Sequence, residues 1–490
     1  MTPAKCKDVR MEPLEDLAKP TLTRQRSTRP QRLAYGKGLR EKVSREDLGG
    51  WQASPDRVDP VRQVIESDYG RVGMLIPLRH GRMATSPYGF FRGAASIFAD
   101  DCATLPYTGI KPIVCGDAHM GNFGFYRSPE GELVMDVNDF DEAHPGPWEW
   151  DLRRLVASLW IAGRENGVSE DDCHEAVMTC VIEYRDELRW LATQPLLRRS
   201  FNRLDVDRLK ETVNESALHS EIERAVKKAR KRTSDRSLPK ITKEESDGKR
   251  KIIDDPPLFI HTSPARAEQL GKALDSYLET LQPQWQRLLD GYTLVDVAHK
   301  VVGVGSVGLR SYLALLQGSS PEDVLFLQLK QARRSVLAKH VHGDVPLHSH
   351  QGQRVVEYQQ CLQTVSDPLL GWTSTPALGE YDPDDEGLDE GSGPVQFYVR
   401  QWRNMKGAIL IDDLDPKALA DYAGVLGLLL AKSHARTSGA SMIIGYIGKS
   451  DKLAEAMSNF ARAYADQNES DHEKFVKAIK DGQIASIDGI

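Results

Sequence analysis

The sequence predicts a mixed α+β fold in which a helical lobe is followed by a β-rich lobe. Its 490 residues exceed what one ordinary core accommodates, so more than one lobe is expected. Apolar residues recur at helical spacing in residues 151–163 and 173–192 and again beyond residue 415. Residues 294–330, by contrast, contain strand-like apolar runs separated by turns.

Composition favours a soluble enzyme. The hydrophobic content is 40%, the charged content is 28% and the net charge is −7, which provides no overall attraction to nucleic acid or to an anionic membrane. The six cysteines lack CxxC spacing, which indicates reduced thiols. The N-terminus has no apolar h-region and no apolar run is long enough to span a membrane, so a cytoplasmic protein is expected.

The first half of the chain is expected to be mainly helical. Residues 1–55 are rich in Arg, Lys, Pro and Thr and predict a flexible N-terminal segment. Residues 56–225 predict the helical lobe, interrupted at 113–151 by strand, loop, strand and turn. Residues 226–255 predict a basic linker. A patch for an anionic partner is the alternative, although acidic residues interrupt the run and no aromatic residue is present for stacking.

The second half predicts the β-rich lobe at residues 256–405 and C-terminal helices at 406–490 that return to the helical lobe. Asp415 and Pro416 have the residue types of an N-cap and a first helical turn. Leu419, Leu426 and Leu430 then fall on one face of a long helix.

Candidate chemistry begins in the loop Gly116–Asn122. Phosphoryl transfer to a hydroxyl needs a carboxylate that orients the nucleophile and accepts its proton, and oxygen ligands that hold Mg²⁺. Asn122 follows Asp117 by five positions, which is the spacing of a kinase catalytic loop. A further carboxylate, Asp139, stands after the next apolar stretch, where a second metal ligand is expected.

The blocks CGDAHMGNFG, VNDFDE and WEWDLRRLVAS resemble the core of the aminoglycoside and choline kinase-like branch of the protein-kinase-like fold. The resemblance implies that Asp117 is the catalytic base, that Asn122 and Asp139 are metal ligands, and that Asp151 braces the loop. Cys115 stands where this branch often has His, and Asp141 where it has Gly, but neither departure removes a metal ligand.

The same blocks, with SPYGFFRGAA and VVGVGSVGLR, are similar to a bacterial family, domain of unknown function 2252, over most of residues 60–440. That second resemblance implies no substrate.

A nucleotide-binding element follows the catalytic loop in the sequence. The GxGxxG run at 303–308 lies between strand-like segments, where glycines allow backbone N–H groups to approach phosphates. Lys330 ends a later strand and would reach the phosphates, and Glu357 on the next helix would form its ion pair. A surface role for Glu357, with Glu322 or another residue as the partner, is the alternative. The predicted nucleotide-binding residues are therefore Gly303, Gly305, Ser306, Gly308, Lys330 and Glu357.

In ordinary kinases the glycine-rich lobe comes first, so the order here predicts a circularly permuted, two-lobe protein-kinase-like fold. The chain would be cut before the catalytic loop, and the old ends would be joined through the basic linker. The long helix from Asp415 resembles the helix that normally leads into the catalytic loop. Residues 396–402 would form the hinge, whose backbone would bind adenine.

The expected function is ATP- and Mg²⁺-dependent transfer of phosphate to a small-molecule hydroxyl. Expected partners are ATP and a small-molecule or protein acceptor, with no nucleic acid and no membrane. Alternatives are a protein kinase, a nucleotidyl (AMP) transferase and a non-catalytic nucleotide-binding regulator. A metal hydrolase that uses His119 and His144 with the aspartates is disfavoured, because an i, i+4 histidine pair is absent. Additional candidates for contact with phosphate or substrate, each equally compatible with a salt bridge or a solvated surface, are Arg92, Arg400, Lys406, His434 and Arg436.

Overall fold

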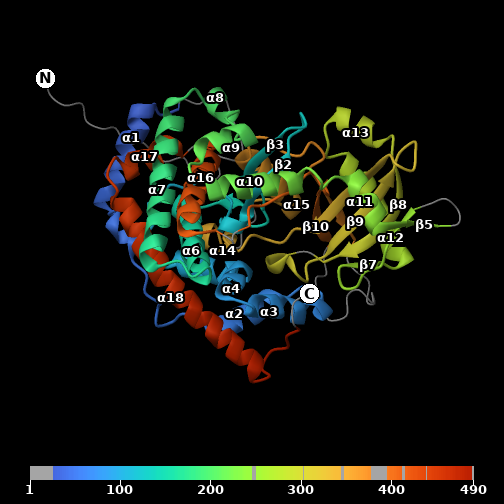
Figure 1. Ribbon diagram of the computed structural model, residues 1–490, viewed down its shortest axis with the longest axis horizontal. Coiled ribbons are helices and arrows are strands. Elements are labelled where there is room, and N and C mark those ends of the chain that lie inside the picture. Colours follow the sequence, from blue (N-terminus) through green and yellow to red (C-terminus); the bar gives the residue numbers. More distant parts are fainter. Residues whose placement is uncertain are drawn as a thin grey trace.

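The computed structural model describes residues 22, 26–245, 250–301, 303–343, 347–376, 394–410, 414–437 and 439–487. The fold is mixed α+β, as predicted. Most helices gather on one side of the molecule and a six-stranded sheet lies on the other (Figure 1). Among the described residues, no helix combines the length and apolar character needed to cross a membrane.

The helices of the first half of the chain are α1 (Arg29–Gly38), α2 (Pro60–Asp68), α3 (Ile76–Ala84), α4 (Pro87–Gly93), α5 (Ala95–Ala103), α6 (Trp148–Glu165), α7 (Glu170–Thr193), α8 (Leu196–Ser200), α9 (Val206–Thr212), α10 (Ser216–Ala229) and α11 (Ser234–Ile241). Those of the second half are α12 (Pro264–Leu278), α13 (Pro283–Leu289), α14 (Ala338–Val341), α15 (Gln351–Leu362), α16 (Pro416–Arg436), α17 (Ala440–Ile447) and α18 (Lys452–Lys480).

The main core lies where C-terminal helices pack against helices from the first half. Helix α16 lies along α7, and α18 contacts both α6 and α7 (Figure 1). The predicted start of α16 is confirmed, because the Asp415 side chain accepts a hydrogen bond from the backbone N–H of Ala418. Gly427 permits close packing of α16 on α7, since a Cβ there would lie 2.1 Å from the carbonyl oxygen of Cys180.

The large sheet is antiparallel and contains β7 (Phe259–His261), β8 (Thr293–Lys300), β9 (Ser311–Gln317), β10 (Val324–Gln331), β11 (Gly371–Thr375) and β12 (Val395–Gln401) in the order β11-β12-β10-β9-β8-β7. The three strands predicted within 294–330 are therefore confirmed as β8, β9 and β10. Alternate residues point to opposite faces. One face packs on α12 and α13 through Tyr277 and Leu289, and the other packs on Leu238 and Ile252.

Two small strand pairs fix the ends of the loops 115–122 and 138–143, which contain candidate site residues. β2 (Phe123–Arg127) and β3 (Leu133–Val137) form the predicted hairpin, and β1 (Ile113–Val114) pairs with β4 (His144–Pro145). These pairings bring the ends of the loops 115–122 and 138–143 together.

The N-terminal segment differs from the prediction of a flexible region at residues 1–55. Residues 1–21 and 23–25 lie outside the described residues, but residues 29–38 form α1, which begins with a capping box between Thr28 and Gln31. Helix α1 packs on α17 at Gly36, where a Cβ would lie 1.9 Å from the carbonyl oxygen of Met442. Close packing through small residues gives no apolar periodicity in the sequence, which explains the error.

The predicted basic linker at residues 226–255 is also wrong in part. It contains the end of α10, helix α11, and the strands β5 (Thr242–Glu244) and β6 (Arg250–Ile252), while residues 246–249 lie outside the described residues. Leu238 and Ile252 are buried against Phe326 and Trp402. The two apolar residues that anchor the segment are far apart in the sequence and are surrounded by charged residues. They therefore form no apolar pattern that predicts burial.

Candidate active site

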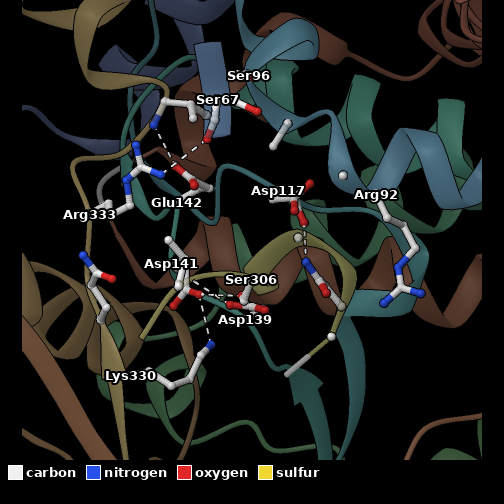
Figure 2. A pocket seen from close by; sticks show the side chains of 18 of the residues that line it. Ser67, Arg92, Ser96, Asp117, Asp139, Asp141, Glu142, Ser306, Lys330 and Arg333 are labelled. Carbon is white, nitrogen blue, oxygen red and sulfur yellow. Dashed lines mark hydrogen bonds and ion pairs between the residues drawn. The ribbon is translucent and has the colours of Figure 1, made fainter. Parts of the chain in front are cut away.

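A cavity of about 320 Å³ brings together residues from distant parts of the chain. Its walls come from α2 to α5, from the loops 115–122 and 138–143, from the glycine-rich turn and from the end of β10. Figure 2 shows Lys330 directed toward Asp141, with Asp117 and Arg92 elsewhere around the cavity. The residues predicted from sequence that line it are Asp117, Asn122, Asp139, Gly303, Gly305, Ser306 and Lys330, with the additional candidates Arg92 and Arg400.

Asp151 on α6 fixes the loop that carries Asp117. The two carboxylate oxygens of Asp151 accept hydrogen bonds from the backbone N–H groups of Cys115 (2.8 Å) and Gly116 (2.9 Å), which is the bracing role expected for Asp151. His434 on α16, which is fully buried, contacts Asp151 at 3.2 Å and lies behind the loop. His434 is therefore not a substrate contact in this structure.

The Asp117 carboxylate has one oxygen engaged by the protein. Arg154 donates from Nε to Oδ1 at 2.8 Å and from Nη2 to the carbonyl oxygen of Phe91 at 2.7 Å. Oδ2 lies 3.9 Å from Nε2 of His119, beyond hydrogen-bond range. Burial lowers the pKa of His119 well below its usual value, so this ring is neutral, and its Nδ1 accepts from the backbone of Gly121. The arrangement orients Asp117 and leaves Oδ2 available to a ligand.

Asn122 is nearly buried at the end of the same loop. Its side-chain Nδ2 donates to the carbonyl oxygen of Asp117 at 2.8 Å, and its backbone carbonyl accepts from Asn138. The amide nitrogen is thereby committed to the loop. Its amide oxygen, a ligand type that Mg²⁺ accepts, remains for other partners at the cavity wall.

Two carboxylates face the cavity from the loop after β3. Burial and then the charge of Asp141 raise the pKa of Asp139. Burial would also raise the pKa of Asp141, but the combined effect of Lys330, the Tyr398 side chain and Arg400 outweighs burial and lowers that pKa below the ordinary value. Lys330 Nζ lies 3.0 Å from Asp141 Oδ2, and Ser306 Oγ lies 3.4 Å from the same oxygen. Figure 2 shows this cluster of Asp139, Asp141, Ser306 and Lys330.

The carboxylate pair fits a divalent cation. Asp141 Oδ1 is buried and receives no hydrogen bond of ordinary geometry among the described residues, which is costly for a charged oxygen. The nearby side chain of Tyr398 lowers the pKa of Asp141 and offsets part of this cost. A second carboxylate, Asp139, lies beside it with its pKa raised by burial and then by repulsion from Asp141. A magnesium ion held by Asp139, Asp141 and the amide oxygen of Asn122 would relieve both effects. The donor set contains only oxygen, as Mg²⁺ prefers.

The glycine-rich turn lies over the cavity and is held by Arg71. Nη1 of Arg71 donates to the carbonyl oxygens of Gly305 (3.0 Å) and Val307 (2.5 Å). Gly308 does not line the cavity. Its positive φ of 83° turns the chain, and its carbonyl oxygen accepts from the backbone N–H of Val72.

The geometry corrects one expectation and bears on one disfavoured alternative. Lys330 pairs with Asp141 and not with Glu357, because Glu357 faces His348, whose Nε2 lies 2.9 Å from its carboxylate. His144 is buried away from the cavity lining, with Nδ1 bonded to the carbonyl oxygen of Pro145 and Nε2 to His342. Among the described residues, no group of three or more His, Cys, Asp or Glu side chains is placed to hold a metal.

Several important residues were missed in the sequence. Arg154 lies one helical turn after Asp151, so the spacing predicts that the two side chains lie on the same face of α6. The spacing does not predict that Asp117 is the partner of Arg154. Arg71 and Arg333 line the cavity from segments without a recognisable motif. Glu142 also lines it, accepts from the backbone N–H of Val336, and has its pKa raised to about 7 by burial. Such contacts depend on long-range topology that local patterns do not encode.

Comparison with known proteins adds a family. Residues 71–478 match the family described as "Uncharacterized protein conserved in bacteria (DUF2252)", which covers well over half of the chain. No curated protein and no solved structure gives a significant match.

Proposed function

This chain belongs to the DUF2252 family of proteins conserved in bacteria, and we propose that it is an ATP- and Mg²⁺-dependent phosphotransferase that acts on the hydroxyl group of a small molecule. The proposed architecture is a circularly permuted, two-lobe kinase-like fold. In it, the chain order of the catalytic loop and the nucleotide-binding sheet is reversed.

One observation carries this proposal. Three segments, the first and last more than two hundred residues apart, supply a candidate base, candidate metal ligands and a lysine to one cavity. The direct link is the 3.0 Å contact between Lys330, at the end of β10, and Asp141, after β3. Phosphoryl transfer requires such a set, because the chemistry depends on positioning and on neutralising phosphate charge.

The roles of the residues follow from their surroundings. Asp117 Oδ2 would accept the proton of the acceptor hydroxyl while Arg154 holds Oδ1 in place. Lys330 and the backbone N–H groups of the glycine-rich turn would contact the phosphates. Mg²⁺ held by Asn122, Asp139 and Asp141 would supply further neutralisation of phosphate charge. Helices α2 to α5 would form the acceptor side of the cavity.

The permuted arrangement is supported by where α16 leads. Helix α16 ends beside the catalytic loop, and His434 in its last turn reaches Asp151, which braces that loop. In an unpermuted kinase the corresponding helix would continue into the loop. Here the covalent connection is replaced by a buried hydrogen-bonded contact.

Calorimetric titration with ATP, in the presence and absence of Mg²⁺, tests the nucleotide site. Asp139→Asn and Lys330→Met should each weaken Mg²⁺-dependent binding by about tenfold or more, because each removes a charged contact to the ligand. Matched controls are Asp171→Asn in the first turn of α7 and Lys272→Met on the surface of α12, which should bind as wild type. Tight ATP binding that is unchanged in both Asp139→Asn and Lys330→Met would contradict the proposal.

The reaction is then separated from nucleotidyl transfer by product mass. Incubation with ATP and a panel of hydroxyl compounds should yield ADP and a product heavier by one phosphate. A product heavier by AMP would assign nucleotidyl transfer instead. Asp117→Asn should abolish product while ATP binding persists, because Asp117 acts on the acceptor.

A further inference from the structure

A second cavity, of about 440 Å³, adjoins the candidate active site. The two cavities share Gly303 and Arg400 in their linings and are therefore adjacent at these two residues. The second cavity is lined on one side by residues of β8, β10 and β12. On the other side it is lined by Arg232, Leu258 and Phe259. We refer to it as the cationic chamber, defined by Arg232, Lys300, Arg400, Arg403 and Lys406 with Trp402.

The lining of the cationic chamber contains positive charge and no carboxylate. Within the described residues, none of its five cations forms an ion pair with an acidic side chain. Their hydrogen bonds go to neutral oxygens: Arg232 to the carbonyl of Lys406, Lys300 to the carbonyl of Val301 and Arg400 to the side chain of Gln328. By contrast, buried Arg57 contacts two aspartates.

This gathering of like charges opposes folding. Burial, followed by repulsion from Arg400 and Arg403, lowers the pKa of Lys300 to about 8. Burial and Arg400 likewise lower the pKa of Lys406 well below its usual value. The five cations are half-buried, and the attraction of Asp139 and Asp141 offsets the repulsion at Lys406 only in part. A group of cations without ion-pairing carboxylates is expected where an anionic ligand supplies further negative charge.

The backbone of the turn after β12 gives independent support. Arg403 and Met405 have positive φ values of 61° and 51°, which non-glycine residues rarely adopt. The turn is fastened to both sides of the molecule, because Met405 N donates to Arg232 O (2.9 Å) and Arg127 N donates to Asn404 O (3.1 Å). Arg403 lies over the ring of Trp402 at 4.5 Å. Strain of this kind is retained at binding sites, and here it presents Arg403 and Lys406 to the chamber.

We propose that the cationic chamber binds phosphate groups of a ligand that reaches it from the candidate active site past Arg400. Arginine and lysine without carboxylate partners match phosphate oxygens in charge and hydrogen-bonding capacity. The phosphates come either from the polyphosphate chain of the nucleotide or from an acceptor that already carries phosphate. The assignment of the ligand as a transferase substrate rests on the proposed function, whereas phosphate binding itself does not.

Inorganic triphosphate without Mg²⁺ is the probe, titrated into the full-length protein by calorimetry. Lys300→Met and Arg403→Gln remove cations that line the cationic chamber only, and each should weaken triphosphate binding by about tenfold. Lys272→Met is the matched control, because Lys272 is exposed and pairs with Glu268 on α12. Both chamber variants should melt no lower than wild type, because each relieves repulsion. Wild-type binding should also weaken as salt is raised.

Competition separates the two sources of phosphate. If ATP displaces triphosphate, and Lys300→Met weakens the binding of both ligands, the chamber holds the phosphates of the nucleotide. If ATP binds alongside triphosphate and is unaffected by Lys300→Met, the chamber belongs to a phosphorylated acceptor. Triphosphate affinity that is equal in wild type and both chamber variants, or absent in wild type, would overturn the proposal. Triphosphate binding in a protein that does not bind ATP would reject the proposed function and leave the chamber assignment standing.

Discussion

Gly116 allows the Asp117 loop to pass directly over the carbonyl oxygen of Glu142. Its φ is 80°, and a Cβ at this position would lie 2.3 Å from that oxygen. The same contact sets the distance between the loop with Asp117 and the loop with Asp139 and Asp141. The absence of a side chain at one residue is therefore a condition for the geometry of the whole site.

Gly116→Ala should destabilise the protein more than Gly109→Ala. Gly109 has an almost equal φ of 84° but open space around its Cβ position, so alanine there costs only the left-handed backbone strain of about 1–2 kcal/mol. At Gly116 the steric conflict should add about 1–3 kcal/mol and displace Asp117. Urea unfolding measures the difference, and equal midpoints for the two variants would contradict the close approach.

His144 makes the protein sensitive to acid. Burial, together with the nearby His342, Arg354 and His348, lowers the pKa of His144 to about 3. In the unfolded chain this ring gains a proton near its ordinary pKa of about 6.5, whereas in the folded chain it stays neutral. Below that pH the unfolded state binds the extra proton, so stability falls as pH falls.

His144→Asn should remove this loss, because an asparagine amide can still donate to the carbonyl oxygen of Pro145. The His144 contribution reaches about 2 kcal/mol at pH 5. Urea unfolding at pH 7.5 and pH 5 should therefore show a smaller difference in the variant than in wild type. His219→Asn on α10 serves as the control and should retain the wild-type difference. Identical pH profiles for wild type and His144→Asn would refute the assignment.

Helices α6, α7 and α16 position the loop that carries Asp117 as a unit. Tyr184 on α7 contacts Nδ1 of His434 on α16 at 2.8 Å, and Nε2 of His434 contacts Asp151 on α6. Asp151 in turn receives the N–H groups of Cys115 and Gly116. The chain of contacts runs from α7 through α16 and α6 to the loop without touching the cavity. His434 is therefore a positioning residue.

His434→Gln should speed hydrogen exchange in residues 113–118 and lower the transfer rate, with little change in ATP affinity. The reason is that Asp151 loses one of the contacts that fix its orientation. Hydrogen–deuterium exchange by mass spectrometry measures the first effect. Tyr184→Phe should show a weaker form of it, whereas His472→Gln on α18 should show none. Unchanged exchange in 113–118 would mean that Asp151 is held by α6 alone.

The sequence predicted elements better than it predicted their partners. The hairpin β2–β3, the strands β8 to β10 and the cap of α16 follow from local spacing and turn residues, and all are present. The pairing of Lys330 with Glu357 was wrong, because the helix that carries Glu357 turns that side chain toward His348. Partners such as Arg154 for Asp117 lie far apart in sequence, and only the assembled fold brings them together.

The sheet and the helical part are joined by the segment between β10 and β11. Gln363 donates to the carbonyl oxygen of Val137, Thr364 N donates to Asp136 and Ser335 donates to the carbonyl oxygen of Glu142. All of these contacts end on β3 or on the loop that follows it. Placement of Lys330 against Asp141 therefore depends on how firmly this segment is fastened to that loop, together with the backbone hydrogen bonds that join Asn404 and Gly407, after β12, to β2.

Arg354 on α15 is the central fastening of that interface. It is 3% exposed and donates to the carbonyl oxygens of Ala143 (2.6 Å), Asp141 (2.8 Å) and Arg333 (2.8 Å). Arg354→Met keeps much of the side-chain length but leaves three buried carbonyl oxygens without this donor. Each loss costs on the order of 1 kcal/mol or more, so the variant should lose about 3 kcal/mol or more.

Differential scanning calorimetry should show whether the two parts then unfold together. Wild type should give one cooperative transition, because the interface is buried and hydrogen-bonded. Arg354→Met should separate it into two, with the sheet and the helical part melting at different temperatures. The control Arg62→Met removes an exposed i, i+4 pair on α2 and should leave a single transition within about 0.5 kcal/mol of wild-type stability. A single transition at the wild-type temperature in Arg354→Met would show that the parts are joined mainly by apolar contacts, and that Lys330 reaches Asp141 without help from α15.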